Sequence, residues 1–229
     1  LFRSCNLSLV VLIFLALNMD FWRTQIGDKQ MNLLKKYVLL FVMASFLPSA
    51  MAQQMTAVET AEKGVETLLA TVAESKNLFL SDRDQYFSNV EGVLNTFVDF
   101  NEVAAVVMSR HAGSASDAQK QRFADILKTT LTRFYGAALV SYNDEELVFL
   151  PAGNPNADPR ADTVVSMELR GADTNLKLQY QMFLNADEEW KLKNLSLVGI
   201  NLGRQYNTQF TALMSQHNND IDLVLNNWK

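Results

Sequence analysis

The spacing of the apolar residues changes twice along this chain, and that change limits the fold more than any other feature. From residue 55 to residue 142, apolar residues recur every three or four positions, which is the period of an amphipathic helix. Between Glu146 and Val198 they alternate with polar residues, which is the period of a strand. Helical spacing returns from Tyr206 to Trp228. This order predicts an α+β domain with helices packed on one face of a four-stranded, mainly antiparallel sheet.

Capping residues and turns place the ends of these elements. Ser81, Asp99 and Ser116 each offer an oxygen to the free N–H groups of a helix start, and a Glu or Gln follows the last two after three residues. The helix that begins at Ser116 is predicted to be the longest and to extend to Tyr142. The predicted strands cover 147–150, 162–170, 175–184 and 190–198.

Three prolines, Pro151, Pro155 and Pro159, fall between the first two predicted strands. The segment 151–162 is therefore expected to be a loop. Two interpretations stay open for it, a plain connection between the strands or an element at the mouth of a pocket or on a docking surface.

The residues that precede the domain have the pattern of a secretory signal peptide over 31–52. An apolar run over 37–47 is well short of the ~20 residues that a membrane-spanning helix needs. Basic residues precede this run, and small residues occupy the positions that signal peptidase reads. These flanking residues are Lys35, Lys36, Ala50 and Ala52. We expect cleavage between Ala52 and Gln53, and export of the rest of the chain.

Because the signal is complete from Met31 onward, residues 1–30 are expected to be upstream sequence that is not part of the native protein, and 53–229 to form a single domain. The exported part lacks five of the chain's 20 basic residues and two of its 25 acidic ones, which leaves a net charge of −8. This charge argues against attraction to nucleic acid or to anionic lipid headgroups. The one cysteine, Cys5, is removed as well, so no disulfide is expected.

Few residues point to catalysis or to metal binding. His111 and His217 are the only histidines, and no nucleophile elbow, phosphate loop, dinucleotide fingerprint or zinc-protease motif occurs. His111 is expected to stabilise the end of a helix as a cation. The acidic clusters 144–146 and 187–189 are expected to be solvated turns. We therefore expect neither an enzyme nor a metal protein.

Large apolar residues are abundant on the predicted helices and on one face of the sheet. Periodicity does not separate a filled core from one that contains a ligand cavity, because both require the same inward-facing residues. The candidates for lining a cavity are Phe87, Val90, Leu94, Phe97, Val107, Phe123, Leu127, Leu131, Phe134, Tyr135, Val165, Met167, Leu178, Tyr180, Met182, Leu195 and Leu197.

Several segments, taken in order, resemble those of the MlaC/toluene-tolerance family of periplasmic phospholipid-binding proteins. The resemblance covers about Val65 to Trp228. The segments that carry it are Val98-Asp99-Phe100, Val106–Arg110, Ser116–Phe123, Trp190-Lys191-Leu192 and Gln205–Phe210. The chain departs from the family at Asn194 and Asn207, where Asp and Arg are usual, and at Val198–Asn201.

The resemblance implies a periplasmic carrier that takes phospholipid between an outer-membrane lipoprotein and porin complex and an inner-membrane ABC transporter with its substrate-binding ring, and so maintains outer-membrane lipid asymmetry. It implies an apolar pocket enclosed by the helices and the sheet, lined by the candidates named above. Phospholipid would be cargo and not a cofactor, and the carrier would be a monomer that binds no nucleic acid. The alternative is a periplasmic interaction module without a lipid ligand.

The energy of exposed acyl chains sets what such a carrier must provide. Two chains contain on the order of 30 methylenes, and at ~0.8 kcal/mol each their exposure to water would cost roughly 24 kcal/mol. Both chains must therefore lie inside the protein, in a cavity near or above the upper end of the usual ~300–1,000 Å³. Apolar walls discriminate poorly between chain lengths, so we expect broad lipid specificity.

Overall fold

The chain divides into two compact units, Leu1–Gln53 and Gln54–Lys229, in a computed structural model. The structure describes residues 54–142, 145–151, 158, 160–171 and 175–228. The predicted upstream segment 1–30, the predicted signal peptide 31–52 with its expected cleavage site, and most of the loop 151–162 lie outside the described residues.

Helices form the first part of this unit, as the apolar spacing predicts. The long helix α8 is the longest of them, although it ends three residues before the predicted boundary. The elements are α4 (Ala57–Ser75), α5 (Leu78–Ser81), α6 (Arg83–Phe97), α7 (Phe100–Met108), a short 3-10 helix η1 (Ser109–Ser114) and α8 (Asp117–Leu139).

The predicted caps of two helices are confirmed. Asp99 caps α7 by accepting hydrogen bonds from the backbone N–H groups of Asn101 and Glu102, and Ser116 forms a reciprocal capping box with Gln119 at the start of α8. The cap predicted at Ser81 is wrong. Asp82 caps α6 instead, while the hydroxyl of Ser81 donates to the carbonyl of Asn77 inside α5.

The sheet has five strands, one more than predicted, and neighbouring strands are antiparallel in the order β1-β2-β3-β4-β5. The fifth strand has only two residues, which pair with Ser196 and Leu197 after a two-residue turn at Val198-Gly199. A strand of two residues is too short to be predicted from the alternation of apolar and polar residues. The strands are β1 (Glu146–Phe149), β2 (Thr163–Arg170), β3 (Asn175–Leu184), β4 (Trp190–Leu197) and β5 (Ile200–Asn201).

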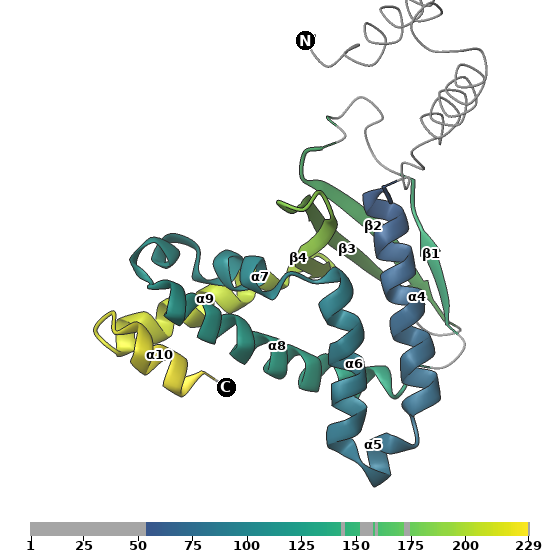
Figure 1. The fold of residues 1–229 in the computed structure, drawn as a ribbon, viewed down its shortest axis with the longest axis horizontal. Coiled ribbons are helices and arrows are strands. Elements are labelled where there is room, and N and C mark those ends of the chain that lie inside the picture. Colours follow the sequence, from purple (N-terminus) through teal and green to yellow (C-terminus); the bar gives the residue numbers. More distant parts are fainter. Residues whose placement is uncertain (1–53, 143–144, 152–157, 159, 172–174, 229) are drawn as a thin grey trace, which may run out of the picture. The chain divides into compact units, whose positions relative to one another are not determined.

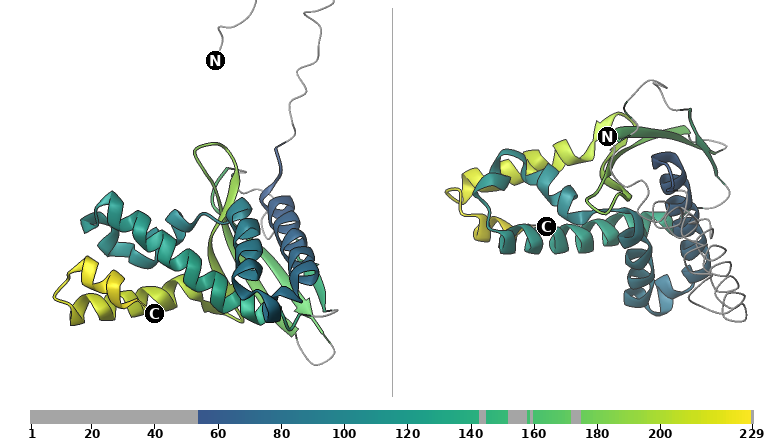
Figure 2. Two further views of the ribbon diagram at one scale, coloured as in Figure 1. Left: turned by 60° about the horizontal axis from the view of Figure 1, so that its bottom comes forward. Right: turned by 45° about the horizontal axis from the view of Figure 1, so that its top comes forward.

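Two further helices, α9 (Leu202–Gln216) and α10 (Ile221–Asn227), complete the unit. Figure 1 shows α4 and α6 side by side on one face of the sheet, with α7, α9 and α10 grouped beside it. Helix α8 runs from that group to α6, and the strands curve around α4 (Figure 2). Packing of helices on one face of the sheet is therefore as predicted.

The buried apolar residues form three clusters. The helical cluster lies among α7, α8, α9 and α10, and its rings include Phe123, Phe210 and Trp228. The sheet cluster lies between the sheet and α4 with Phe97 of α6. The aromatic cluster consists of Leu68, Val72, Tyr86, Phe87 and Val90, from α4 and α6.

Candidate functional site

The inner face of the sheet carries a continuous apolar wall. Val165 and Met167 on β2 and Tyr180 and Met182 on β3 are all buried, because alternate residues of a strand point to the same face. The register pairs Val165 with Tyr180 directly across the two strands. Burial raises the pKa of Tyr180 to about 12, so its phenol is neutral at physiological pH. The wall is thus uncharged.

Small residues on α4 allow this helix to approach both the sheet and α6 closely. Ala57 and Ala61 face the sheet cluster, and Gly64 faces the ring of Phe97. A Cβ added at Gly64 would lie 2.7 Å from two ring carbons of Phe97, which leaves no room for a larger residue. Helix α4 and the end of α6 therefore form the second wall of the site, opposite the sheet.

The sheet cluster continues into the aromatic cluster through Val93 and Leu94 of α6, which pack against both. At the far end Tyr86 is buried and donates a hydrogen bond of 2.7 Å to the carbonyl of Gly136 on α8. The Phe87 ring packs edge-on against Tyr86, with ring centroids 5.4 Å apart. The two clusters together form one apolar layer that follows α4 and α6.

The predicted lining residues do not all meet in this layer. Val107, Phe123 and Leu127 belong to the helical cluster, and Leu131 packs against it. Tyr135 is half-buried, and its hydroxyl lies 3.5 Å from that of Tyr206. Those that the structure brings together in the sheet and aromatic clusters, or against them, are Phe87, Val90, Leu94, Phe97, Val165, Met167, Leu178, Tyr180, Met182 and Leu195.

The expectation that Phe134 points inward is wrong. Its side chain is 68% exposed. The buried residues of α8 are Phe123, Ala124 and Leu127 in the first half, but Thr132 and Gly136 in the second. Different sides of α8 are buried in its two halves, because the first half packs in the helical cluster and the second half packs against α6. The apolar spacing of the first half, continued along the helix, does not predict this change of partner.

Sequence reasoning missed part of the wall. Ala57, Ala61 and Val65 of α4 belong to the sheet cluster, as do Trp190 and Leu192 of β4. The signal was present, since the apolar stripe of 55–75 and the alternation of 190–198 predict both elements. The spacing of apolar residues does not identify the element against which each apolar face packs.

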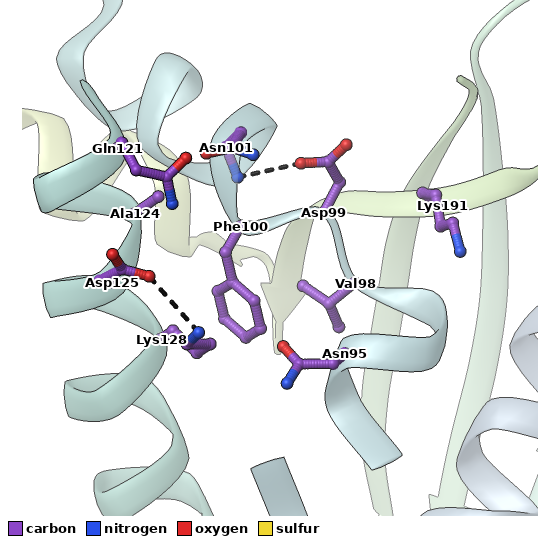
Figure 3. A pocket seen from close by; sticks show the side chains of 10 residues that line it. All are labelled: Asn95, Val98, Asp99, Phe100, Asn101, Gln121, Ala124, Asp125, Lys128 and Lys191. Atoms are coloured by element: carbon purple, nitrogen blue, oxygen red, sulfur yellow. Dashed lines mark hydrogen bonds and ion pairs between the residues drawn. The ribbon is translucent and has the colours of Figure 1, made fainter. Parts of the chain in front are cut away.

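A separate polar hollow of about 270 Å³ lies where α6 ends, α7 begins and α8 passes (Figure 3). Lys128 extends along it with its Nζ 3.4 Å from a carboxylate oxygen of Asp125, and Asp99 accepts a 2.9 Å hydrogen bond from the N–H of Asn101. The Phe100 ring borders it. Its volume and its charged lining suit a small polar group and do not suit acyl chains.

The histidines occupy structural positions. His111 lies in η1, beyond the end of α7, and its Nε2 accepts a 3.3 Å hydrogen bond from Nε of Arg110. Its expected role, a cation at the end of a helix, stays a prediction. His217 is the C-cap residue of α9. Within the described part of the chain, no group of three or more His, Cys, Asp or Glu side chains could hold a metal ion.

No helix among the described residues has the length and apolar character to cross a bilayer. The family model of the MlaC protein matches residues 62–229. The toluene tolerance protein ttg2D of Pseudomonas putida is 27% identical over 191 residues, 83% of this chain and 87% of that protein.

A phospholipid-binding protein from Ralstonia solanacearum, whose structure was solved in complex with a phospholipid, shares the fold. It is 22% identical, with a TM-score of 0.68 over 75% of this chain and 94% of that chain. The family match extends over most of the second unit, including α6, the sheet and α8. The chain belongs to the MlaC family.

Proposed function

We propose that this protein is a phospholipid carrier whose acyl-chain site lies between the sheet wall and the pair α4 and α6. The observation that supports it most directly is the uncharged wall of Val165, Met167, Tyr180 and Met182, opposite helices of small and apolar residues. Membership of the MlaC family and the phospholipid in the Ralstonia solanacearum relative support the same function.

The site opens when the helices part from the sheet. The backbone hydrogen bonds of α4 and of the sheet lie within each element, so separation breaks only side-chain packing and exposes apolar surface that acyl chains then cover. One end stays joined, because the N–H of Asp99 donates a 3.0 Å hydrogen bond to the carbonyl of Leu192, and Nζ of Lys191 donates to the carbonyl of Thr96. The unbranched Met167 and Met182 adapt to chains of different length.

The remaining features of the proposal are supported by the signal-peptide pattern of the sequence and by the family. Residues 31–52 direct export and are cleaved near Ala52, and 53–229 acts in the periplasm as a single-domain monomer. It exchanges phospholipid with an outer-membrane lipoprotein and porin complex and with an inner-membrane ABC transporter that carries a substrate-binding ring. The phospholipid is cargo, and the protein performs no catalysis.

Two matched substitutions test where the acyl chains lie. Val165→Phe fills the sheet wall, and Val107→Phe adds the same volume to the helical cluster, at a site that is just as buried. Each costs about 1–3 kcal/mol of stability through overpacking. Native mass spectra of both variants, purified from a bacterial periplasm, should show that Val165→Phe loses most of its bound phospholipid and Val107→Phe keeps it. Equal retention by both variants would contradict this location.

A further inference from the structure

The turn between β4 and β5 presents apolar side chains to solvent. Val198 is 58% exposed and Ile200 is 57% exposed, on either side of Gly199. Leu197 pairs with Ile200, so Val198 and Gly199 alone form the turn. A two-residue hairpin turn is convex, and its side chains reach farther from the sheet than those of the strands it joins.

The backbone of this turn does not suit the residue it contains. Val198 has a φ of +51° and Gly199 a φ of +79°, so both central residues are in the left-handed region. Turns of this kind favour Asn, Asp or Gly at the first position, and a β-branched residue there is a genuine outlier. Strained residues of this type occur mainly at functional sites. The turn thus keeps an apolar side chain where folding alone favours a polar one.

Cations adjoin the turn. The N–H of Val198 donates a 2.8 Å hydrogen bond to the carbonyl of Lys177, whose side chain is exposed, and Arg204 is exposed in the first turn of α9. Glu168 is two strands from the turn, roughly 10 Å by strand spacing, but it lies directly opposite Lys177 across β2 and β3, and it forms an ion pair with Arg170. Screening limits the influence of more distant charges to about 8 Å at physiological salt. Lys177 and Arg204 both lie nearer to the turn than this carboxylate does, so the charge beside the turn is net positive, although the chain as a whole is negative.

We infer that the tip of the β4–β5 hairpin is a membrane-contact site, in which Val198 of the turn and Ile200 of β5 enter the interface of a phospholipid bilayer while Lys177 and Arg204 contact lipid phosphates. Two apolar side chains on a convex turn bury too little area for a stable protein interface, which needs roughly 800 Å² per partner. A bilayer interface accepts such a turn and gains from cations beside it. Contact of this size is reversible, as a carrier requires.

Flotation with vesicles of phosphatidylethanolamine and phosphatidylglycerol tests the inference. Val198→Asn combined with Ile200→Thr removes the apolar side chains and places a residue suited to the left-handed region in the turn, so the variant should fold as well as the wild type. We expect at least a tenfold weaker vesicle binding for this variant. Lys177→Gln and Arg204→Gln should each weaken binding about fivefold.

Val164→Thr is the matched control, because Val164 is similarly exposed but lies within β2, and this variant should bind vesicles like the wild type. The inference would be overturned if the turn variant bound vesicles as well as the wild type does, or if the wild type bound none. The exposed turn would then be assigned to contact with a protein partner. The amount of phospholipid bound to the turn variant, measured by native mass spectrometry, distinguishes this membrane-contact site from the proposed cargo site. The turn variant should keep its cargo, and loss of cargo would assign the turn to the pocket instead.

Discussion

Gly64 sets the distance between α4 and α6. A Cβ at this position would lie 2.7 Å from Cδ1 and Cγ of Phe97, whose ring is buried in the sheet cluster. Gly64→Ala should therefore lower the free energy of unfolding by about 1–3 kcal/mol, because either the ring or the helix must shift. Urea unfolding measures this change.

Gly92 on α6 is the matched control. A Cβ added there meets no atom within 4 Å, and Gly92 lies in the interior of a helix. Gly92→Ala should raise the free energy of unfolding by roughly 0.5–1 kcal/mol, the difference in helix propensity. The same stability for both variants would show that α4 and α6 are not held at this distance.

Tyr180 makes the stability of the fold sensitive to alkali. Burial raises its pKa from 10.0 to about 12, so the unfolded chain releases this proton at lower pH than the folded one. Its contribution is complete below pH 10 and is lost as the pH rises toward 12, at about 1.4 kcal/mol per pH unit. Burial also raises the pKa of Tyr86 and Tyr135, with the same sign.

Unfolding free energies measured between pH 9 and pH 12 should fall less steeply for Tyr180→Phe than for the wild type. The phenylalanine keeps the ring in the sheet wall and removes the titrating hydroxyl. Identical slopes for the two proteins would mean that Tyr180 is not shielded from water, and the sheet wall would then be more open than its burial indicates.

Single residues also mark the limit of what sequence predicts. The cap at Ser116 was predictable because the two residues of its capping box, Ser116 and Gln119, lie within four residues of sequence. Ser81 and Asp82 are adjacent and both can cap a helix, so local sequence does not choose between them. The exposure of Phe134 depends on which helix α8 meets at that point, which is tertiary information that periodicity does not contain.

At the scale of elements, Asn194 joins β4 to the start of α9. Its Oδ1 accepts hydrogen bonds from the N–H of Gly203, at 3.0 Å, and of Leu195, and its Nδ2 donates to Asn201. Gly203 is required here, since a Cβ would lie 2.7 Å from both Oδ1 of Asn194 and Cγ1 of Val106. This contact places α9 against both β4 and α7.

Asn194→Ala should lower the free energy of unfolding by about 1–3 kcal/mol, because it leaves the buried N–H of Gly203 without its acceptor. Asn194→Asp keeps the acceptor and should recover most of that loss. Chemical denaturation of the two variants provides the comparison. If both variants were equally destabilised, the hydrogen bond from the N–H of Gly203 to the side chain of residue 194 would not be what holds α9 in place.

The elements themselves were largely predictable, and their partners were not. The predicted strand 175–184 coincides with β3 because alternation is clear over ten residues. The two-residue strand β5 has too few residues to show a period. Val107, Phe123 and Leu127 are buried, but in the helical cluster and not with the residues of the sheet wall, since an inward-facing stripe indicates burial and not which of three clusters it joins.

At the scale of the whole molecule, separate clusters allow one region to open while another stays folded. The helical cluster is closed by its own aromatic contacts, such as Phe123 against Trp228 with centroids 4.9 Å apart. The sheet wall meets α4 and α6 through the apolar side chains of the sheet cluster. A carrier built in this way can part the helices from the sheet for acyl chains without loss of the helical cluster.

The most direct test is a native mass spectrum, with extraction and identification of lipids, of the protein purified from a bacterial periplasm after expression of the full chain. We expect phospholipid bound to the folded protein, with mixed acyl-chain lengths, because apolar walls discriminate weakly between chains. A protein that carries no phospholipid, and takes up none on incubation with phospholipid vesicles, would contradict the proposed carrier function.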